Sequence, residues 1–380
     1  MRGNLLLKFN ITNFKKTYLY YLNFILNNNS YKIHILNECK KMFDSSHCAD
    51  CEKVDCLTRC QWIEFKDIEE ARAEKDKMIK GEESRVLSEC VTCFACDEYC
   101  PYNSHPFDLI TELQEKYNSL SINPSILENT VKIYAPHAEL RLKEIDPNKP
   151  VLNKCAFGKL DAKHMQGQLF ENLQYVSGLD FFCNLMYHHY ARDSVIKERA
   201  PIIIENIKKQ GIKEMICYHD ECYGFYASFC PRNNIELPPD FKPIHIYEYL
   251  YKYLKEHESD VKKLNMKIAY QRSCSNRFIP EADEWVDKIC NLIGVQRVAR
   301  KYDRENTMCC AGIFATLGKK SLLRKTQNDN VNDMLEYGAE ACVYNCPMCM
   351  ESMGSKVGRK GLKNYILSDL CRMALGESVE

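Results

Sequence analysis

The feature of this sequence that most constrains its fold is a pair of adjacent cysteines, Cys309 and Cys310, set between other cysteines. Cys274 lies upstream, with 34 residues between it and the pair, and Cys346 and Cys349 begin 35 residues after it. Adjacent cysteines are poorly placed to bond to each other, because disulfide geometry strains such a pair. A single zinc ion takes four ligands and would leave one thiolate over. Five thiolates gathered from three loops therefore indicate an iron–sulfur cluster.

This spacing resembles the cysteine-rich CCG domain of heterodisulfide reductase, in which a cysteine, a cysteine pair and a Cys-x-x-Cys are separated by two long gaps. In that family the domain carries a noncubane iron–sulfur cluster at which a disulfide is reduced. The resemblance implies that the five cysteines hold such a cluster and that Cys309 and Cys310 are catalytic. One departure is that Ala311 follows the pair where the family usually has glycine, and Gly312 comes one place later.

A second set of cysteines lies nearer the start of the chain. The run Cys90-x-x-Cys93-x-x-Cys96-x-x-x-Cys100-Pro101 follows the bacterial ferredoxin pattern, in which three cysteines hold one [4Fe-4S] cluster and the fourth ligates another. An earlier run, Cys48-x-x-Cys51-x4-Cys56-x3-Cys60, has a similar pattern. It differs in the gap between Cys51 and Cys56, which is two residues longer than usual, and in Gln61, which stands where proline is expected. On the ferredoxin pattern one cluster is held by Cys48, Cys51, Cys56 and Cys100, and the other by Cys60, Cys90, Cys93 and Cys96. The alternative for the earlier run is a separate four-cysteine zinc site.

From residue 151 onwards the sequence repeats itself. Each unit opens with a strand that leads into a cysteine loop and continues with helices, a short strand and a final amphipathic helix. Strands that alternate with helices indicate a parallel sheet, with ligands at the carboxyl ends of the strands. The predicted fold class is α/β, with an α-helical two-cluster ferredoxin domain followed by two repeated α/β CCG domains. The predicted strands are 151–155, 215–218, 267–270 and 341–344, and the predicted helices are 106–116, 202–210, 244–254, 281–293, 331–337 and 365–375.

The first of these units is a degenerate copy of the second. Its Cys183 and Cys222 have 38 residues between them, as do Cys310 and Cys349, and Cys155 takes the place of Cys274. Phe182 and His219 then replace two cysteines. Three thiolates and one imidazole make a tetrahedral zinc set of Cys155, Cys183, His219 and Cys222. The alternatives are that these residues are relics, or that His219 faces the substrate and donates a proton.

These features divide the chain into five predicted segments. Residues 1–41 carry no motif, and we expect them to be an extension that is not native. Residues 42–120 form the ferredoxin domain and residues 121–150 are a proline-containing linker. The degenerate repeat covers residues 151–255 and the complete repeat covers residues 256–380.

Composition limits the partners. The formal net charge is zero, which argues against nucleic acid. No apolar run approaches the roughly 18 residues of a membrane-spanning helix. Sixteen of the 22 cysteines fall into the motifs above and no signal peptide is evident, so we expect reduced ligands in the cytoplasm. Peripheral attachment to a membrane could come through a partner, or through an amphipathic leader in residues 1–41. The other six are expected to be buried small hydrophobes: Cys39, Cys217, Cys230, Cys290, Cys342 and Cys371.

The resemblance extends over residues 42–380 to the D subunit of heterodisulfide reductase, or to its C and B subunits joined. It implies an oxidoreductase subunit that passes electrons through two cubane clusters to the noncubane cluster, which reduces a disulfide substrate. Because the sequence has no nucleotide-binding fingerprint, the electrons are expected to come from a flavin, hydrogenase or cytochrome subunit. Two alternatives remain. One is an electron relay, as in the iron–sulfur subunits of anaerobic glycerol-3-phosphate dehydrogenase and glycolate oxidase, and the other is a scaffold without turnover.

Two further pairs of residues have two interpretations each. Arg272 and Arg277 flank Cys274, where they could hold an anionic thiol substrate or be solvated loop charges. His188 and His189 follow Cys183, where they could donate protons or be inert.

Overall fold

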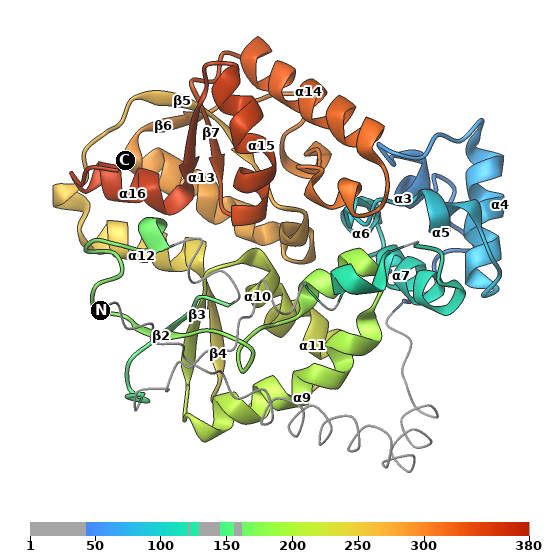
Figure 1. Cartoon of the computed structure of the whole chain (residues 1–380), viewed down its shortest axis with the longest axis horizontal. Helices are drawn as coiled ribbons and strands as arrows, with labels where there is room; N and C mark the ends of the chain where they lie inside the picture. The colour runs from blue at the N-terminus through green and yellow to red at the C-terminus, as the bar shows by residue number, and fades with distance from the viewer. Residues whose placement is uncertain (1–42, 121, 128, 130–144, 156–161, 380) are drawn as a thin grey trace, which may run out of the picture. The chain divides into compact units, whose positions relative to one another are not determined.

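The structure is a computed structural model that describes residues 43–120, 122–127, 129, 145–155 and 162–379 (Figure 1). The described residues all belong to one compact unit, Met42–Glu380. The predicted extension 1–41, with Cys39, and most of the predicted linker lie outside the described residues.

The part that carries the ferredoxin-type cysteines is helical. Its elements are α3 (Asp55–Thr58), α4 (Ile68–Ile79), α5 (Arg85–Glu89), α6 (Ala95–Tyr99) and α7 (Pro106–Tyr117). Helix α7 begins at Pro106, as the sequence predicts, since the first helical position has no need of a backbone N–H. Helix α4 is capped by Asp67, whose carboxylate accepts from the backbone N–H of Glu70. The core of this helical part is apolar, and Val54, Leu57 and Ile110 are among the side chains that fill it.

The rest of the chain contains two parallel four-stranded sheets, which confirms the predicted α/β class. Their strand orders are β2-β1-β3-β4 and β6-β5-β7-β8. The two sheets therefore have the same topology, with the second strand of each unit at one edge. We call the parts built on them the first and the second repeat. The strands are β1 (Val151–Asn153), β2 (Gln174–Val176), β3 (Glu214–Cys217), β4 (Lys242–His245), β5 (Met266–Gln271), β6 (Val295–Arg297), β7 (Ala341–Tyr344) and β8 (Lys363–Ile366).

The helices of the repeats follow the prediction with some differences. Helix α13 ends at Gly294, whose φ of +67° is the left-handed cap that glycine allows. Helices α9 and α14 begin well before residues 202 and 331, and α9 continues through the exposed Pro201. The helices are α9 (Asp193–Lys209), α10 (Asp220–Gly224), α11 (Cys230–Arg232), α12 (Ile246–Glu256), α13 (Asp283–Ile293), α14 (Lys320–Glu336), α15 (Pro347–Arg359) and α16 (Leu367–Ala374).

Helices α12 and α13 lie between the two sheets and give the repeats a common core (Figure 1). Leu250 and Leu254 of α12 are fully buried, as are Val286 and Ile289 of α13 and Leu370 of α16. Burying each such side chain contributes roughly 1.5–3 kcal/mol. The two repeats are therefore joined by apolar packing and not by the chain alone.

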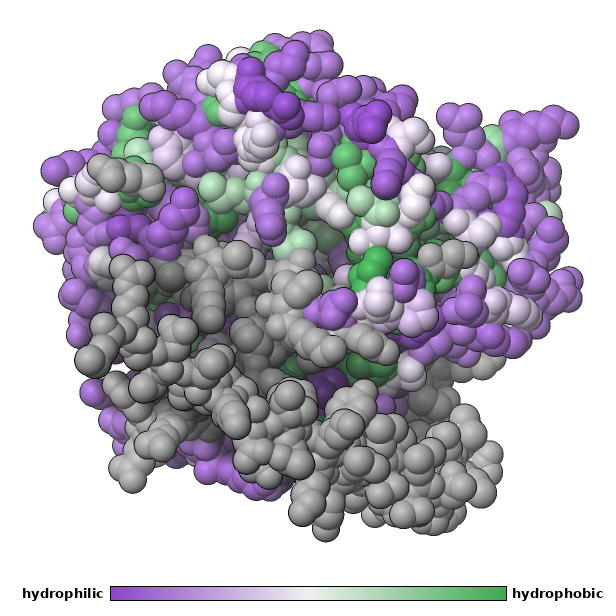
Figure 2. All heavy atoms as spheres, viewed as in Figure 1, coloured by the Kyte–Doolittle hydropathy of each residue, from purple (hydrophilic) through white to green (hydrophobic). Residues whose placement is uncertain are grey.

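The described surface is largely hydrophilic on the face drawn in Figure 2, where hydrophobic residues gather only in small groups. The large hydrophobic side chains exposed among the described residues come from separate elements: Ile68, Tyr102, Tyr175, Ile202, Leu335 and Tyr337. None of the helices in the described part of the chain has the length and apolar character needed to cross a membrane.

Candidate metal centres

The five cysteines of the second repeat come together at the carboxyl ends of its strands. Cys274 follows β5, Cys309 and Cys310 occupy the loop before a short 3₁₀ turn, and Cys346 and Cys349 begin α15. Hydrogen bonds between thiols connect them in the order Cys274, Cys309, Cys310, Cys349 and Cys346. We call this group the five-cysteine centre. Every described cysteine is a free thiol, so no disulfide competes for these sulfurs.

The turn after the cysteine pair explains why glycine suits this position. Ala311 is fully buried and has a φ of +62°, a left-handed conformation that costs an L-residue about 1–2 kcal/mol. In this conformation the backbone N–H of Ala311 donates to the Sγ of Cys309 (3.3 Å), and that of Gly312 donates to the Sγ of Cys310 (3.4 Å). The alanine therefore keeps the turn, at a cost that glycine would avoid.

The charge state of the five-cysteine centre suits metal binding. A hydrogen bond from Cys309 lowers the pKa of Cys274 to about 5, against the effect of burial. Hydrogen bonds from Cys309 and Cys349 likewise lower the pKa of Cys310. The same interactions raise the pKa of Cys309 and Cys349. Because thiolates and not thiols bind metals, two sulfurs of the centre favour the binding form before any metal binds and two favour the thiol.

His189 links this centre to the ferredoxin-type cysteines. Its Nε2 lies 3.4 Å from the Sγ of Cys274, and its Nδ1 lies 2.8 Å from the carbonyl oxygen of Thr92. The ring of Phe94 stacks on the imidazole, with 4.5 Å between the ring centroids. Thr92 and Phe94 stand between the cysteines of the ferredoxin run. Burial lowers the pKa of His189, but the charge of Cys274 and the hydrogen bond to it outweigh burial and raise the pKa to about 9.

A cavity of about 180 Å³ opens beside the five-cysteine centre. The five cysteines and Ser275, Gly312, Ile313, Thr316, Pro347 and Met348 line it from the second repeat. The first repeat contributes Met186, His189, Tyr190, His219, Asp220 and Glu221. A small molecule could therefore reach the sulfurs from the side where the two repeats face each other.

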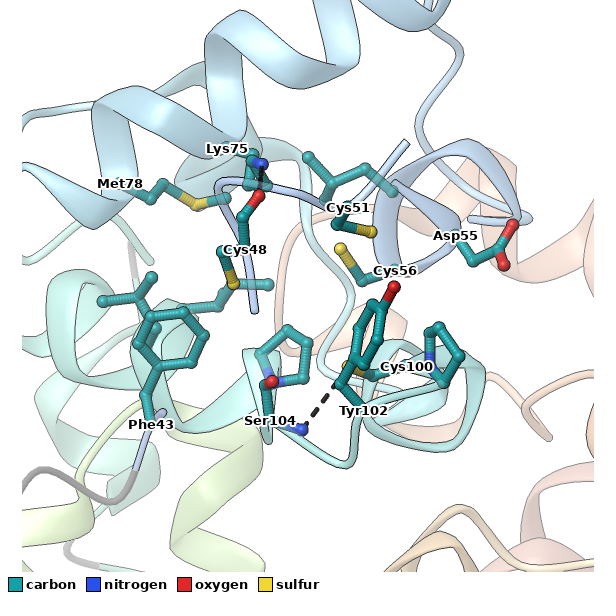
Figure 3. A pocket seen from close by; sticks show the side chains of 15 residues that line it. Phe43, Cys48, Cys51, Asp55, Cys56, Lys75, Met78, Cys100, Tyr102 and Ser104 are labelled. Carbon is teal, nitrogen blue, oxygen red and sulfur yellow. Dashed lines mark hydrogen bonds between the residues drawn. The ribbon is translucent and has the colours of Figure 1, made fainter. Parts of the chain in front are cut away.

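The ferredoxin-type cysteines fall into the two predicted groups. Cys48, Cys51, Cys56 and Cys100 line one pocket, where their side chains surround a common space (Figure 3). A second pocket is lined by Cys60, Cys90, Cys93 and Cys96, with Cys56 at its edge and apolar side chains around it. We call these the Cys48 group and the Cys90 group.

Hydrogen bonds to sulfur occur in both groups. The backbone N–H of Ser104 donates to Cys100 (3.4 Å), and that of Thr92 donates to Cys90 (3.3 Å). The indole Nε1–H of Trp62 donates to the Sγ of Cys93 (3.2 Å). Such bonds stabilise the negative charge of cluster ligands and help to set their reduction potentials. The residues present therefore fit two [4Fe-4S] clusters.

The first repeat brings three of its four candidate ligands, Cys155, His219 and Cys222, into one group, and the fourth, Cys183, lies beside the two thiols of that group. The Sγ of Cys183 lies 4.0 Å from that of Cys155 and 3.9 Å from that of Cys222. One ligand atom each from Cys155, His219 and Cys222 lies within 4.8 Å of the others. Zinc–sulfur bonds of about 2.3 Å in a tetrahedron place the sulfurs about 3.8 Å apart, close to these distances. All four residues are buried, and we call them the first-repeat centre.

Neither interpretation of Arg272 and Arg277 is correct. Both side chains are buried, and each places its Nη1 2.7 Å from a carboxylate oxygen of Glu98 on α6. Arg272 also donates to Asn276, and Arg277 donates to the carbonyl oxygen of Thr307. The two arginines thus hold the ferredoxin part against the second repeat, and they face neither a substrate nor bulk water.

The cysteines outside the motifs behave as the sequence predicts within the described residues. Cys217, Cys230, Cys290, Cys342 and Cys371 are each buried. Burial raises the pKa of all five thiols.

The comparison with protein families agrees with the geometry of the second repeat. Residues 268–354 match the family described as CCG, cysteine-rich domain. The chain carries a CCG domain. The matched segment runs from β5 into α15 and contains the whole five-cysteine centre. Together with the many other cysteines, this domain indicates an iron–sulfur protein of the oxidoreductase type.

Solved structures add information on the fold alone. The crystal structure of a hypothetical protein from Helicobacter pylori is 12% identical, with a TM-score of 0.54 over 93% of this chain and 76% of that chain. A glutamate racemase isoform from Bacillus anthracis is also 12% identical, over 61% of this chain and 81% of that chain, but its TM-score of 0.32 supports no argument. No curated protein matches this chain.

Sequence reasoning did not find the roles of Glu98 and His189. Glu98 sits inside the ferredoxin run, where an acidic residue has no special meaning by itself. His189 contacts Cys274 and Thr92, which lie 85 and 97 positions away from it in the chain, so no local pattern predicts these contacts. The one available signal was the position of the pair soon after Cys183, on the loop that corresponds to the one carrying Cys310.

Proposed function

We propose that the chain is an iron–sulfur oxidoreductase subunit that reduces a disulfide at the five-cysteine centre, in the manner of heterodisulfide reductase. The observation that carries this proposal is the cavity beside that centre. A pure electron relay needs its clusters close together but needs no opening at the last one. Here the space that the five cysteines border would hold their cluster, and it continues past them to Met186, Tyr190 and His219 of the first repeat, where part of a small molecule could enter.

In this proposal the Cys48 group and the Cys90 group each hold a [4Fe-4S] cluster, and the five-cysteine centre holds a noncubane cluster. The clusters supply one-electron chemistry when bound. The protein provides the thiolates, the N–H donors to sulfur and the shielding from water. Residues 42–120 act as the electron entry domain, residues 121–150 as a linker, and residues 151–255 and 256–380 as the two repeats.

The surroundings of His189 support a route between the Cys90 group and the five-cysteine centre. The imidazole contacts Thr92, Phe94 and Cys274, so packed atoms and hydrogen bonds span the gap between the two sets of sulfurs. Electrons that enter from a flavin, hydrogenase or cytochrome partner would cross the Cys48 group first, and then the Cys90 group. A zinc ion in the first-repeat centre would hold the neighbouring wall of the cavity in place.

The test uses anaerobically purified full-length protein, its Cys310→Ser variant and a matched Cys342→Ser control, in which the buried cysteine of β7 is replaced. We expect Cys310→Ser to lose the paramagnetic signal of the noncubane cluster and the reduction of disulfides by reduced methyl viologen. The two cubane signals should remain, because their ligands lie in another part of the chain. The control should keep all three signals and the activity.

Two results would count against the proposal. Cluster-loaded protein that reduces a quinone analogue but no disulfide would identify an electron relay. A Cys310→Ser variant that keeps the noncubane signal would show that the five-cysteine centre is not its ligand set.

A further inference from the structure

Two cysteines of the five-cysteine centre directly follow a buried polar residue. Ser273 precedes Cys274 in the loop after β5, and Asn345 precedes Cys346 directly after β7. Both polar side chains are 1% exposed, so each needs a hydrogen-bond partner within the protein. The two share one such partner, Asp220, which belongs to the first repeat.

The carboxylate of Asp220 holds both loops at once. The hydroxyl of Ser273 donates to its Oδ2 (2.9 Å), and the Nδ2 of Asn345 donates to the same oxygen (3.2 Å). The other oxygen, Oδ1, accepts from the Nδ2 of Asn276 (3.1 Å), which lies in the turn that begins at Cys274. The loops after β5 and β7 are therefore tied to one carboxylate, which lies 53 positions from Ser273 and 125 positions from Asn345 in the chain.

The first repeat holds this carboxylate in place from the other side. Asp220 is the first residue of α10 and is 1% exposed. The hydroxyl of Tyr247 on α12 donates to its Oδ1 (2.9 Å), and the Nε2 of His245 lies 3.2 Å from the same oxygen. Tyr247 belongs to the core that α12 shares with both sheets. Because a buried and satisfied polar network is rigid, Asp220 can serve as a fixed point for the two loops.

The support runs in one direction between the repeats. Cys222 and Cys349 occupy equivalent positions, so the equivalent of Asp220 in the second repeat is Pro347, whose side chain accepts no hydrogen bond. The second repeat therefore receives a carboxylate from the first and returns none from this position. This gives the first repeat a task that does not depend on a cluster of its own.

From these contacts we infer that Asp220 is a positioning residue for the cluster of the five-cysteine centre, and that it sets the places of Cys274 and Cys346 by holding the residues before them. The inference rests on the cluster that the proposed function assigns to this centre, and on no step of disulfide reduction. Loss of a polar partner that orients metal ligands typically costs about 10–100-fold in metal affinity. Asp220 also borders the cavity, so its effect is measured on the cluster and not on turnover.

The main variant is Asp220→Asn in the cluster-loaded full-length protein. Asparagine has nearly the same size, but it has one acceptor oxygen and turns an NH₂ group towards the donors on its other side. One of the loops must therefore lose its partner. We expect the concentration of bathophenanthroline disulfonate, an iron chelator, that removes half of the noncubane paramagnetic signal to fall about tenfold. The remaining noncubane signal should also shift its position, because its ligand sulfurs are displaced. The two cubane signals should not change, because their ligands lie in the ferredoxin part.

Asp369→Asn is the matched control. Asp369 is also a buried carboxylate, 2% exposed, and the Nδ1 of His164 lies 2.7 Å from its Oδ2. It accepts in addition from the backbone N–H of Ile366 at the start of α16 (2.9 Å). The control thus removes an equally buried carboxylate that joins the two repeats, at a place where neither partner adjoins a ligand of the five-cysteine centre. Its noncubane signal should resist the chelator as the wild-type signal does.

Ser273→Ala keeps the test decisive if loss of the buried carboxylate prevents folding. It removes one donor and leaves Asp220 bound to Tyr247, Asn276 and Asn345. We expect a smaller fall in chelator resistance than in Asp220→Asn, again confined to the noncubane signal. In the double variant Ser273→Ala should add less than it costs alone, because both substitutions remove the same hydrogen bond.

The outcomes separate this inference from the function on which it rests. If the wild-type protein holds the noncubane cluster and Asp220→Asn resists the chelator as well as Asp369→Asn does, Asp220 does not position the ligands. An unchanged noncubane signal in Ser273→Ala overturns the inference as well, and so does a fall of all three signals together in Asp220→Asn, which would indicate a general loss of stability. A wild-type protein that forms no noncubane cluster contradicts the proposed function itself, and the inference falls with it.

Discussion

Replacing Glu98 with glutamine should loosen the attachment of the ferredoxin part to the second repeat. The Glu98 side chain is 11% exposed, and its carboxylate oxygens lie 2.7 Å from Arg272 and Arg277, whose side chains are 1% and 2% exposed. Removing one partner of a buried ion pair costs about 3–5 kcal/mol, because a buried charge is left without compensation. Here one substitution removes the partner of two charges.

The neutral partners of the arginines set the size of the effect. Arg272 keeps its bond to Asn276, and Arg277 keeps its bonds to the carbonyl oxygens of Glu305 and Thr307. The glutamine can still accept one hydrogen bond. We therefore expect a loss near the lower end of that range, about 3 kcal/mol in the free energy of unfolding.

The assay is urea unfolding of the anaerobic protein, followed by circular dichroism. Glu112→Gln on α7 serves as the matched control, because this glutamate is exposed. Exposed substitutions of this kind change stability by about 0.5 kcal/mol or less. If Glu98→Gln lies within that margin of the control, the ion pairs do not stabilise the structure in the way argued here.

Two further substitutions test other parts of the structure. Ala311→Gly should raise the free energy of unfolding by about 1 kcal/mol, because it relieves an alanine in the left-handed conformation, whereas Ala200→Gly within α9 should lower it by at least about 1 kcal/mol. Urea unfolding of both variants measures the two changes, and a destabilised Ala311→Gly protein would contradict the argument. Cys222→Ser should remove about one zinc ion per chain from the first-repeat centre, while Cys230→Ser should not; metal analysis measures this, and equal zinc in both variants would rule out Cys222 as a ligand.

The sequence predicted the strands and helices whose residue pattern is long or distinctive. The strand at 341–344 was located within a residue at either end, and the stop of α13 at Gly294 was predicted because glycine is favoured at such a cap. Strands β2, β4, β6 and β8 were not predicted. Strands β2 and β6 have three residues each, and β4 and β8 have four residues each and run directly into an amphipathic helix. A segment of that length has no period that distinguishes it from the first turn of the helix.

The candidate site likewise has parts that the sequence predicted and parts that it did not. Cysteine spacing predicted which sulfurs would meet, through short offsets in the ferredoxin run and through long gaps that resemble those of the CCG family in the second repeat. The contacts of Glu98 with Arg272 and Arg277 join residues 174 and 179 positions apart, and no local pattern announces them. The contribution of the first repeat to the cavity wall, through His189 and Glu221, also depends on tertiary packing and could not be predicted from the sequence.

The core that α12 and α13 share with both sheets has a consequence for how the chain folds. If the second repeat were separated from the first, the apolar surface that α13 presents to α12 would be left facing water. Such a fragment would be prone to aggregate, although it contains every residue of the matched family segment. The two repeats should therefore melt in a single cooperative transition, so that the unit of sequence relationship is smaller than the unit of folding.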